Sequence, residues 1–363
     1  RLALSVANVQ ASDRRSGDWR GLREASREMV SIRTLAAALA VGALLSPAGA
    51  EACVPSVGRD SALGTSRTVE IDTSKGPLYG FQYKDQNFLN DGEVVLTFDD
   101  GPLRSYTVPV LEALAAHCTK ATFFVVGRMA VADPDMVKEY DRRGHTIGTH
   151  TWSHVNLRAA SPARARAEIE LGFSAVQKAL GKPIAPFFRF PFLADPPGMI
   201  AHLKERQIGI FSIDVDSKDF RTRDPVTVHR RVMGDVARPR KGIILFHDIQ
   251  PSTARALPGL LADLKAKGYR VVHMVPKAAA ATVAEFDAQA QQELDRKRTA
   301  ASAQPLAKRA LTWPVATGVP NEAASAKPGA DAARAPDPAA RPPKRAPRPK
   351  QEESWPPSKL LFW

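Results

Sequence analysis

The 363-residue sequence lacks the signatures of the common nucleic-acid-binding modules. No RNP-like, zinc-finger or helix-turn-helix pattern occurs in it. The formal net charge of +13 is not concentrated in one segment, because residues 1–90, 91–276 and 277–363 carry +2, +6 and +5 by count of charged residues. We therefore expect no nucleic acid among the partners, and we expect the charge to favour solubility and contact with an anionic envelope polymer.

Cysteine is nearly absent, and so are long apolar runs. The only two cysteines, Cys53 and Cys118, form either one disulfide or two free buried thiols. The main apolar stretch is the short one at residues 35–45, which follows a basic start after Met29 and ends before an A-x-A-like site at Ala50. This pattern predicts a secretory signal peptide over residues 29–50.

Export follows from that prediction. We expect a periplasmic or secreted protein that has no stable membrane span once the signal peptide is removed. The compartment would be oxidising, which favours pairing of the two cysteines. Residues 1–28 precede Met29 and are expected not to belong to the native product.

Between Glu93 and Val275, short apolar runs alternate with amphipathic segments. The apolar runs predict strands at residues 94–97, 122–126, 146–149, 187–190, 208–213, 243–246 and 270–274. The amphipathic segments predict helices at 108–116, 134–142, 162–180 and 257–267. Seven strand and helix repeats predict an α/β fold whose parallel sheet is either open or closed into a barrel.

The composition changes after Pro276. Ala-rich sequence, expected to be helical to about Thr299, is followed by a mixture of Pro, Ala, Lys and Arg that cannot bury enough apolar area to fold. We expect an N-terminal extension at 51–90, a catalytic domain at 91–276 and a disordered tail at 277–363. The basic tail is expected to contact anionic wall polymer.

Polar residues follow the ends of several predicted strands. They are Asp99, Asp100, His150, His154, Arg189, Asp214, Asp216, Asp219, His247 and Asp248. In a β/α barrel the carboxyl ends of all strands share one face, so residues distant in sequence converge on one cleft. This placement predicts an active site there.

Two histidines in this set have a spacing suited to a metal ion. His150 and His154 are four residues apart, and a carboxylate from Asp99 or Asp100 would complete a site with two imidazoles, one carboxylate and open positions for water. The alternatives are an incidental His pair and two Asp residues that only cap the next helix. The coincidence of the His pair with a double Asp at a strand end favours the metal.

Five short motifs occur in order at these strand ends. They read TFDDGP at 97–102, HTWSH at 150–154, RFPF at 189–192, DSKDF at 216–220 and LFH at 245–247. In these motifs the sequence resembles the polysaccharide deacetylases of carbohydrate esterase family 4, which share the NodB homology domain. The resemblance covers about residues 91–276, and it implies a distorted (β/α)7 barrel. It departs from the family pattern at Phe192, where Tyr is commoner, and at Phe220, which replaces Trp.

The resemblance implies a metal centre and a base. Asp100, His150 and His154 would bind one divalent ion, zinc or alternatively cobalt, which acts as a Lewis acid on the amide carbonyl. Asp99, adjacent but not a ligand, would be the general base that takes the proton of the attacking water. Arg189 would hold Asp99 ionised and in place.

The resemblance also implies the remaining roles. The backbone N–H of Phe192 would stabilise the oxyanion, and this donor survives the change from Tyr. His247, oriented by Asp219, would protonate the departing amine. Leu245 and Phe220 would form the wall of the pocket for the acetyl methyl group.

The expected function is hydrolysis of N-acetyl groups on N-acetylglucosamine units of peptidoglycan or a chitin-like oligomer, with release of acetate. Three alternatives remain open: a chitooligosaccharide deacetylase of the nodulation type, an O-acetyl xylan esterase, and an inactive sugar-binding module that keeps the fold. None of the five motif Asp and His residues at positions 99, 100, 150, 154 and 247 is missing, which favours an enzyme.

Overall fold

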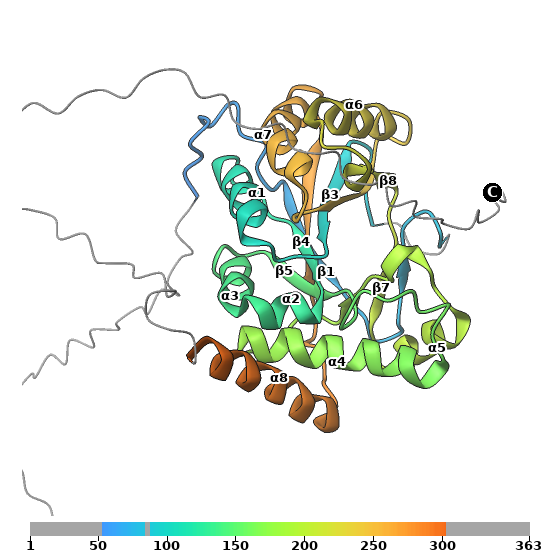
Figure 1. Cartoon of the computed structure of the whole chain (residues 1–363). Coiled ribbons are helices and arrows are strands. Elements are labelled where there is room, and N and C mark those ends of the chain that lie inside the picture. Colours follow the sequence, from blue (N-terminus) through green and yellow to red (C-terminus); the bar gives the residue numbers. More distant parts are fainter. Residues whose placement is uncertain (1–52, 84–87, 303–363) are drawn as a thin grey trace, which may run out of the picture. The chain divides into compact units, whose positions relative to one another are not determined.

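A computed structural model describes residues 53–83 and 88–302, which lie in one compact unit (Figure 1). The predicted signal peptide, the segment before it and the tail beyond residue 302 lie outside the described residues. Among the helices that the structure describes, none has the length and apolarity needed to cross a membrane.

All strand pairs in the sheet are parallel. The strands are β1 (Arg67–Ile71), β2 (Leu78–Tyr79), β3 (Glu93–Asp99), β4 (Thr122–Val125), β5 (Thr146–Thr149), β6 (Phe187–Phe188), β7 (Gly209–Phe211), β8 (Val215–Asp216), β9 (Gly242–His247) and β10 (Arg270–Pro276). The seven predicted strands correspond to β3, β4, β5, β6, β7, β9 and β10. The sequence did not predict β1, β2 or β8.

The barrel is formed by hydrogen-bonded neighbours in the order β8, β9, β3, β4, β5, β6, β7. It is distorted because β7 is followed directly by β8 without an intervening helix, and because β6 and β8 have only two residues each. β10 pairs with β3 only at Arg270 and Val271, and it pairs with β1 along its length. Within the described residues, no hydrogen-bonded pair joins β7 to β8. The prediction of a parallel α/β fold of the distorted (β/α)7 barrel type is confirmed.

Helices cover the outside of the strands. They are α1 (Arg104–Ala116), α2 (Gly127–Ala132), α3 (Pro134–Arg142), α4 (Pro162–Leu180), α5 (Pro197–Glu205), α6 (Pro225–Val236), α7 (Pro251–Ala266) and α8 (Ala284–Ser302), with 3-10 turns η1 (Pro191–Leu193) and η2 (Asp219–Arg221). The four predicted helices correspond to α1, α3, α4 and α7, and α8 confirms the helix expected to about Thr299. Figure 1 shows α8 packed along α4.

Local sequence explains where several helices begin and end. Asp133 and Ser161 accept hydrogen bonds from the first turns of α3 and α4, and a proline follows each of them. Gly181 ends α4 with φ 83°, a left-handed conformation that costs glycine little.

The alternation of side chains along β3 separates two cores. Val94, Leu96 and Phe98 pack into the main apolar cluster between the strands and the helices. Val95 faces the other way, into a second cluster together with residues of β4, β6, β7 and β9. Asp99 is two positions beyond Thr97 on the inward face, so the end of β3 directs its carboxylate into the top of the barrel.

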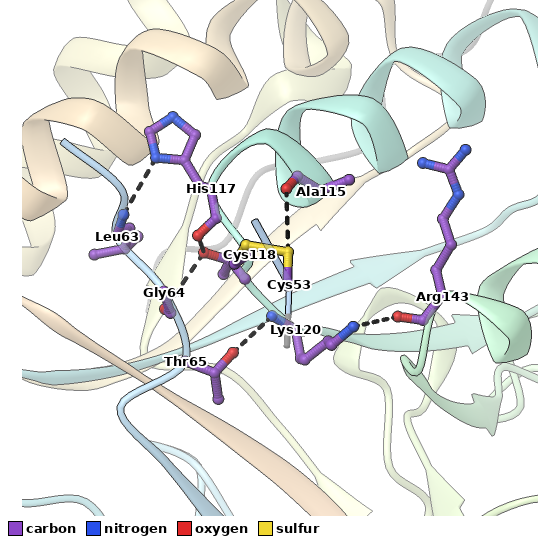
Figure 2. The surroundings of a disulfide bond; sticks show 10 residues. Cys53, Leu63, Gly64, Thr65, Ala115, His117, Cys118, Lys120 and Arg143 are labelled. Atoms are coloured by element: carbon purple, nitrogen blue, oxygen red, sulfur yellow. Dashed lines mark hydrogen bonds between the residues drawn. A yellow bond between two sulfur atoms is a disulfide. The ribbon is translucent and has the colours of Figure 1, made fainter. Parts of the chain in front are cut away.

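The segment before β3 is tied to the domain at both ends. Cys53 and Cys118 form a disulfide (Figure 2), which decides between the two alternatives left open by the sequence. Next to it, the N–H groups of Leu63 and Gly64 donate to the ring Nδ1 and the carbonyl of His117, at 3.3 and 2.9 Å. Further along, β1 pairs with β10 and β2 pairs with β7, so this segment is part of the sheet.

Candidate active site

The carboxyl ends of the strands surround a cavity of about 290 Å³. Its lining residues are Asp99, Asp100, His150, His154, Phe190, Phe192, Leu193, Asp216, Phe220, Leu245 and His247. Eight of the ten predicted site residues are in this set. The other two, Arg189 and Asp219, are fully buried behind it, and each is bonded to a lining residue. The structure therefore brings all ten together.

Asp99 is anchored by a buried guanidinium. Arg189 Nη1 donates to Asp99 Oδ1 at 2.7 Å and to Thr97 Oγ1 at 2.8 Å. The same guanidinium donates to the carbonyl oxygens of Phe211 and Ser212 at 3.2 and 3.1 Å, so its orientation is fixed on several sides. Burial raises the pKa of Asp99 to about 6, and the positive charge of Arg189 opposes a larger rise.

Asp100, His150 and His154 lie close enough to hold one ion between them. Their ligand atoms all lie within 4.8 Å of one another. His154 Nε2 is 3.2 Å from Asp100 Oδ1, and His150 Nε2 is 3.7 Å from the same oxygen. Asp99 Oδ2 is 3.8 Å from His150 Nε2, so Asp99 borders this cluster.

The chemistry of this cluster fits a divalent cation. Asp100 Oδ1 is buried, yet no protein donor bonds to it, which is costly for a carboxylate oxygen unless a cation lies beside it. His150 Nδ1–H donates to the Arg189 carbonyl at 2.7 Å, leaving the Nε2 lone pair directed at the cluster. Burial keeps the pKa of His150 well below its usual value, so the ring is neutral and able to coordinate.

His247 stands opposite this cluster and is held by Asp219. The backbone N–H of His247 donates to Asp219 Oδ2 at 2.8 Å, and its Nδ1–H donates to Oδ1 at 2.6 Å. Thr253 Oγ1 also donates to Asp219 Oδ2. Burial lowers the pKa of His247, but the hydrogen bond and charge of Asp219 outweigh it and raise the value to about 9. Its Nε2 is 3.8 Å from Asp100 Oδ2.

Aromatic side chains flank the mouth of the cavity. Phe192 is 65% exposed, and its ring meets the edge of His154 at a centroid distance of 4.7 Å. Phe220 is 51% exposed and lies edge-on to His247 at 5.6 Å. Leu245 is buried between these walls. The cavity thus combines a floor of carboxylate and imidazole side chains with apolar sides open to solvent.

Comparison with known proteins identifies the family. The family sequence model described as "Polysaccharide deacetylase" matches residues 87–208. The peptidoglycan-N-acetylglucosamine deacetylase of Listeria monocytogenes is 35% identical over 182 residues, which cover 49% of this chain and 37% of that protein. The chitin deacetylase of Colletotrichum lindemuthianum is 32% identical over 195 residues, which cover 50% of this chain and 77% of that protein. The chain belongs to the polysaccharide deacetylase family.

A solved structure agrees with this family assignment. The peptidoglycan deacetylase of Bdellovibrio bacteriovorus is similar with a TM-score of 0.55 and 34% sequence identity, over 61% of each chain. The family predicted from the five motifs is therefore confirmed. The chain spans only about a third of the length of the Listeria relative.

Two residues support the site in ways that the sequence did not reveal: Asp248 was expected at this end of the barrel but without its partners, and Tyr83 was not expected there. Buried Asp248 accepts hydrogen bonds from Tyr140 Oη at 2.5 Å and from Thr107 Oγ1 at 2.6 Å, directly beneath Gly101. Tyr83, in the segment before β3, donates to Asp195 at 2.9 Å and so braces the loop after Phe192. The signal for Asp248 was its place beside His247, whereas an isolated Tyr83 gives no sequence signal.

Proposed function

We propose that this protein is a metal-dependent hydrolase that removes N-acetyl groups from a polysaccharide containing N-acetylglucosamine, either peptidoglycan or a chitin-like oligomer, and releases acetate. The observation that carries the proposal is the buried, unpartnered oxygen of Asp100, which faces two imidazoles and lies next to a carboxylate anchored by Arg189. The names of the Listeria and Colletotrichum relatives support an N-deacetylase and leave both polymers open.

Asp100, His150 and His154 would hold one divalent ion, either Zn²⁺ or Co²⁺. Two nitrogen ligands and one carboxylate with open positions are one of the donor sets found in catalytic zinc sites. When bound, the ion supplies Lewis-acid chemistry to the acetyl carbonyl and lowers the pKa of water.

Asp99 is proposed as the general base. Asp99 Oδ1 accepts the hydrogen bond from Arg189, and Oδ2, 3.8 Å from His150 Nε2, is the oxygen that would accept a proton from water. With a pKa of about 6 it is ionised at neutral pH while remaining a useful base. The water that loses its proton to Asp99 adds to the carbonyl carbon of the acetyl group.

His247 is proposed as the general acid. At neutral pH its raised pKa keeps it protonated, and Asp219 occupies Nδ1, so Nε2–H is the proton that faces the cavity. Transfer of this proton to the amide nitrogen lets the C–N bond break, which gives acetate and the free sugar amine. His247, which lies beside Asp99 on the neighbouring strand β9, thus completes the hydrolysis together with Asp219.

The remaining site residues are proposed to fit the acetyl group. The backbone N–H of Phe192 would donate to the developing oxyanion, a stabilisation that does not depend on the side chain. Leu245 and Phe220 would enclose the acetyl methyl group. Phe220 offers no indole N–H in place of the family's Trp, so its contribution is restricted to packing.

We also propose an exported protein with a signal peptide at 29–50 and a catalytic domain at 91–276. The disulfide between Cys53 and Cys118 supports an oxidising compartment. A wall polymer as substrate requires export as well. The basic tail at 277–363 is proposed to contact anionic wall polymer.

Acetate release from peptidoglycan, chitooligomers and acetylxylan, each measured with and without chelator, tests the proposal. We expect chelator-sensitive release from an N-acetylated glycan. Asp99→Asn should keep the metal and lose turnover, whereas His150→Ala should lose metal on elemental analysis. Release from acetylxylan alone would indicate an O-acetyl esterase, and glycan binding without any release would indicate an inactive sugar-binding module.

A further inference from the structure

The turn that carries both proposed histidine ligands has an unusual backbone. Thr151 and His154 have φ of 68° and 59°, in the left-handed region that residues with side chains avoid. Such a backbone conformation is strained, and it persists only where its surroundings hold it. The turn from His150 to His154 therefore needs support from neighbouring elements.

One residue of α4 accepts three hydrogen bonds from the middle of this turn. The N–H of Ser153 donates to Glu168 Oε2 at 2.9 Å, and Ser153 Oγ donates to Oε1 at 2.7 Å. The N–H of Trp152 donates to the backbone carbonyl of Glu168 at 2.8 Å. Glu168 is only 8% exposed, so water competes little for these bonds.

One helical turn further along α4, a glycine lets the same turn approach the helix. A Cβ on Gly172 would lie 2.7 Å from the carbonyl carbon of Thr151 and 3.0 Å from its Cα. Because residues four apart share one face of a helix, Glu168 and Gly172 act on the same side of the turn. The turn is also held by α2, where Gly127 N–H donates to the Thr151 carbonyl at 2.9 Å.

We propose that Glu168 and Gly172 are positioning residues that fix the separation of His150 and His154 and thereby set the affinity of the protein for its divalent ion. This inference rests on the ligand set of the proposed function. Glu168 holds the centre of the turn by hydrogen bonds, and Gly172 sets how deeply the turn sits on α4. Neither residue touches the ion.

Zinc affinity of the purified full chain, measured by competition with a chromophoric chelator, tests the proposal. Glu168→Ala should raise the dissociation constant tenfold to a hundredfold, the range typical of residues that orient metal ligands. The matched control is Glu170→Ala, because Glu170 is also a buried carboxylate of α4 but bonds to His202 and Arg206, away from the turn. Glu170→Ala should lower stability without changing zinc affinity.

Gly172→Ala provides a second measurement that does not depend on the buried carboxylate. Alanine has a higher helix propensity than glycine, so loss of zinc affinity in a folded Gly172→Ala variant reports displacement of the turn and not a weakened helix. Gly259→Ala in α7 is its control, since nothing lies within 4 Å of the added Cβ. Ser153→Ala, which removes only the hydroxyl bond, should weaken zinc binding several-fold and keep the fold.

A zinc affinity of the Glu168→Ala variant within about twofold of that of the unmodified protein would overturn the inference. Equal losses of zinc affinity in Glu168→Ala and Glu170→Ala would overturn it as well. If Glu168→Ala does not fold, unchanged affinity in Gly172→Ala and Ser153→Ala overturns it instead. Absence of zinc binding by the unmodified chain contradicts the proposed function, a different outcome from unchanged affinity in the variants.

Discussion

Removal of the disulfide should destabilise the protein without altering its active site. The double variant Cys53→Ser/Cys118→Ser opens a link that joins positions 65 residues apart. In the chain-entropy description, a link of this length lowers the entropy of the unfolded chain by an amount worth about 4 kcal/mol at 25 °C. That value is an upper limit for the loss of stability.

The native structure sets the expected loss below this limit. Residues 56–61, just after Cys53, are exposed, so they gain conformational freedom in the folded variant once the link is open. The bonds from Leu63 and Gly64 to His117 remain and keep the rest of the segment in place. We therefore expect a loss of about 2–4 kcal/mol in the free energy of unfolding.

Urea denaturation followed by tryptophan fluorescence measures this loss. The m-value should rise slightly, because an unfolded chain without the link exposes more surface. Reductant added to the unmodified protein should reproduce the effect, and zinc affinity should stay the same, since no lining residue of the cavity belongs to the segment. A free energy of unfolding of the double variant within about 0.5 kcal/mol of that of the unmodified protein would refute the entropic reasoning.

Three further outcomes are expected. Gly101→Ala should cost about 1–3 kcal/mol in urea denaturation, because the added Cβ collides with the buried carboxylate of Asp248; an unchanged midpoint would contradict this close packing. In the metal-free protein the folded pKa of His247, about 9, exceeds the ordinary 6.5, so its contribution to stability is full below about pH 6.5 and is lost as pH rises through 9. Asp219→Asn should remove most of that dependence, and an NMR titration that still places His247 near 9 would refute the assigned cause. Phe192→Tyr should leave kcat/KM within about threefold, since the proposed donor is the backbone N–H; a tenfold change would show that the side chain takes part.

Regular patterns made much of the fold predictable. The buried strand β3 contains the mainly apolar run VVLTF, and α4 has a Ser cap, a first-turn proline and a closing glycine. Short elements gave no such pattern: β8 has only two residues, and it is defined by its pairing with β9, which lies about 30 positions further along the chain. The helix α6 was not predicted, although its start could have been recognised from the sequence: Asp224 precedes Pro225 and caps the first turn.

The residues of the candidate site also fall into those that the sequence predicts and those that it does not. His150 and His154 are recognisable because ligands of one ion have a characteristic spacing. Glu168 and Gly172 carry no comparable signal, since a glutamate and a glycine on an amphipathic helix look like ordinary helix residues. Their importance depends on where the turn at 150–154 docks, which is a property of the tertiary structure.

The pairing of β1 with β10 has a consequence for the order of events during synthesis. Ser66 bonds to Val271, 205 positions later, so β1 has no partner until the last strand of the sheet has been made. At about 5–20 residues per second this interval is on the order of tens of seconds. Cys118 precedes β10 along the chain, so a chain that enters an oxidising compartment N-terminus first can close the link to Cys53 and hold this segment beside α1 while β1 is still an unpaired edge.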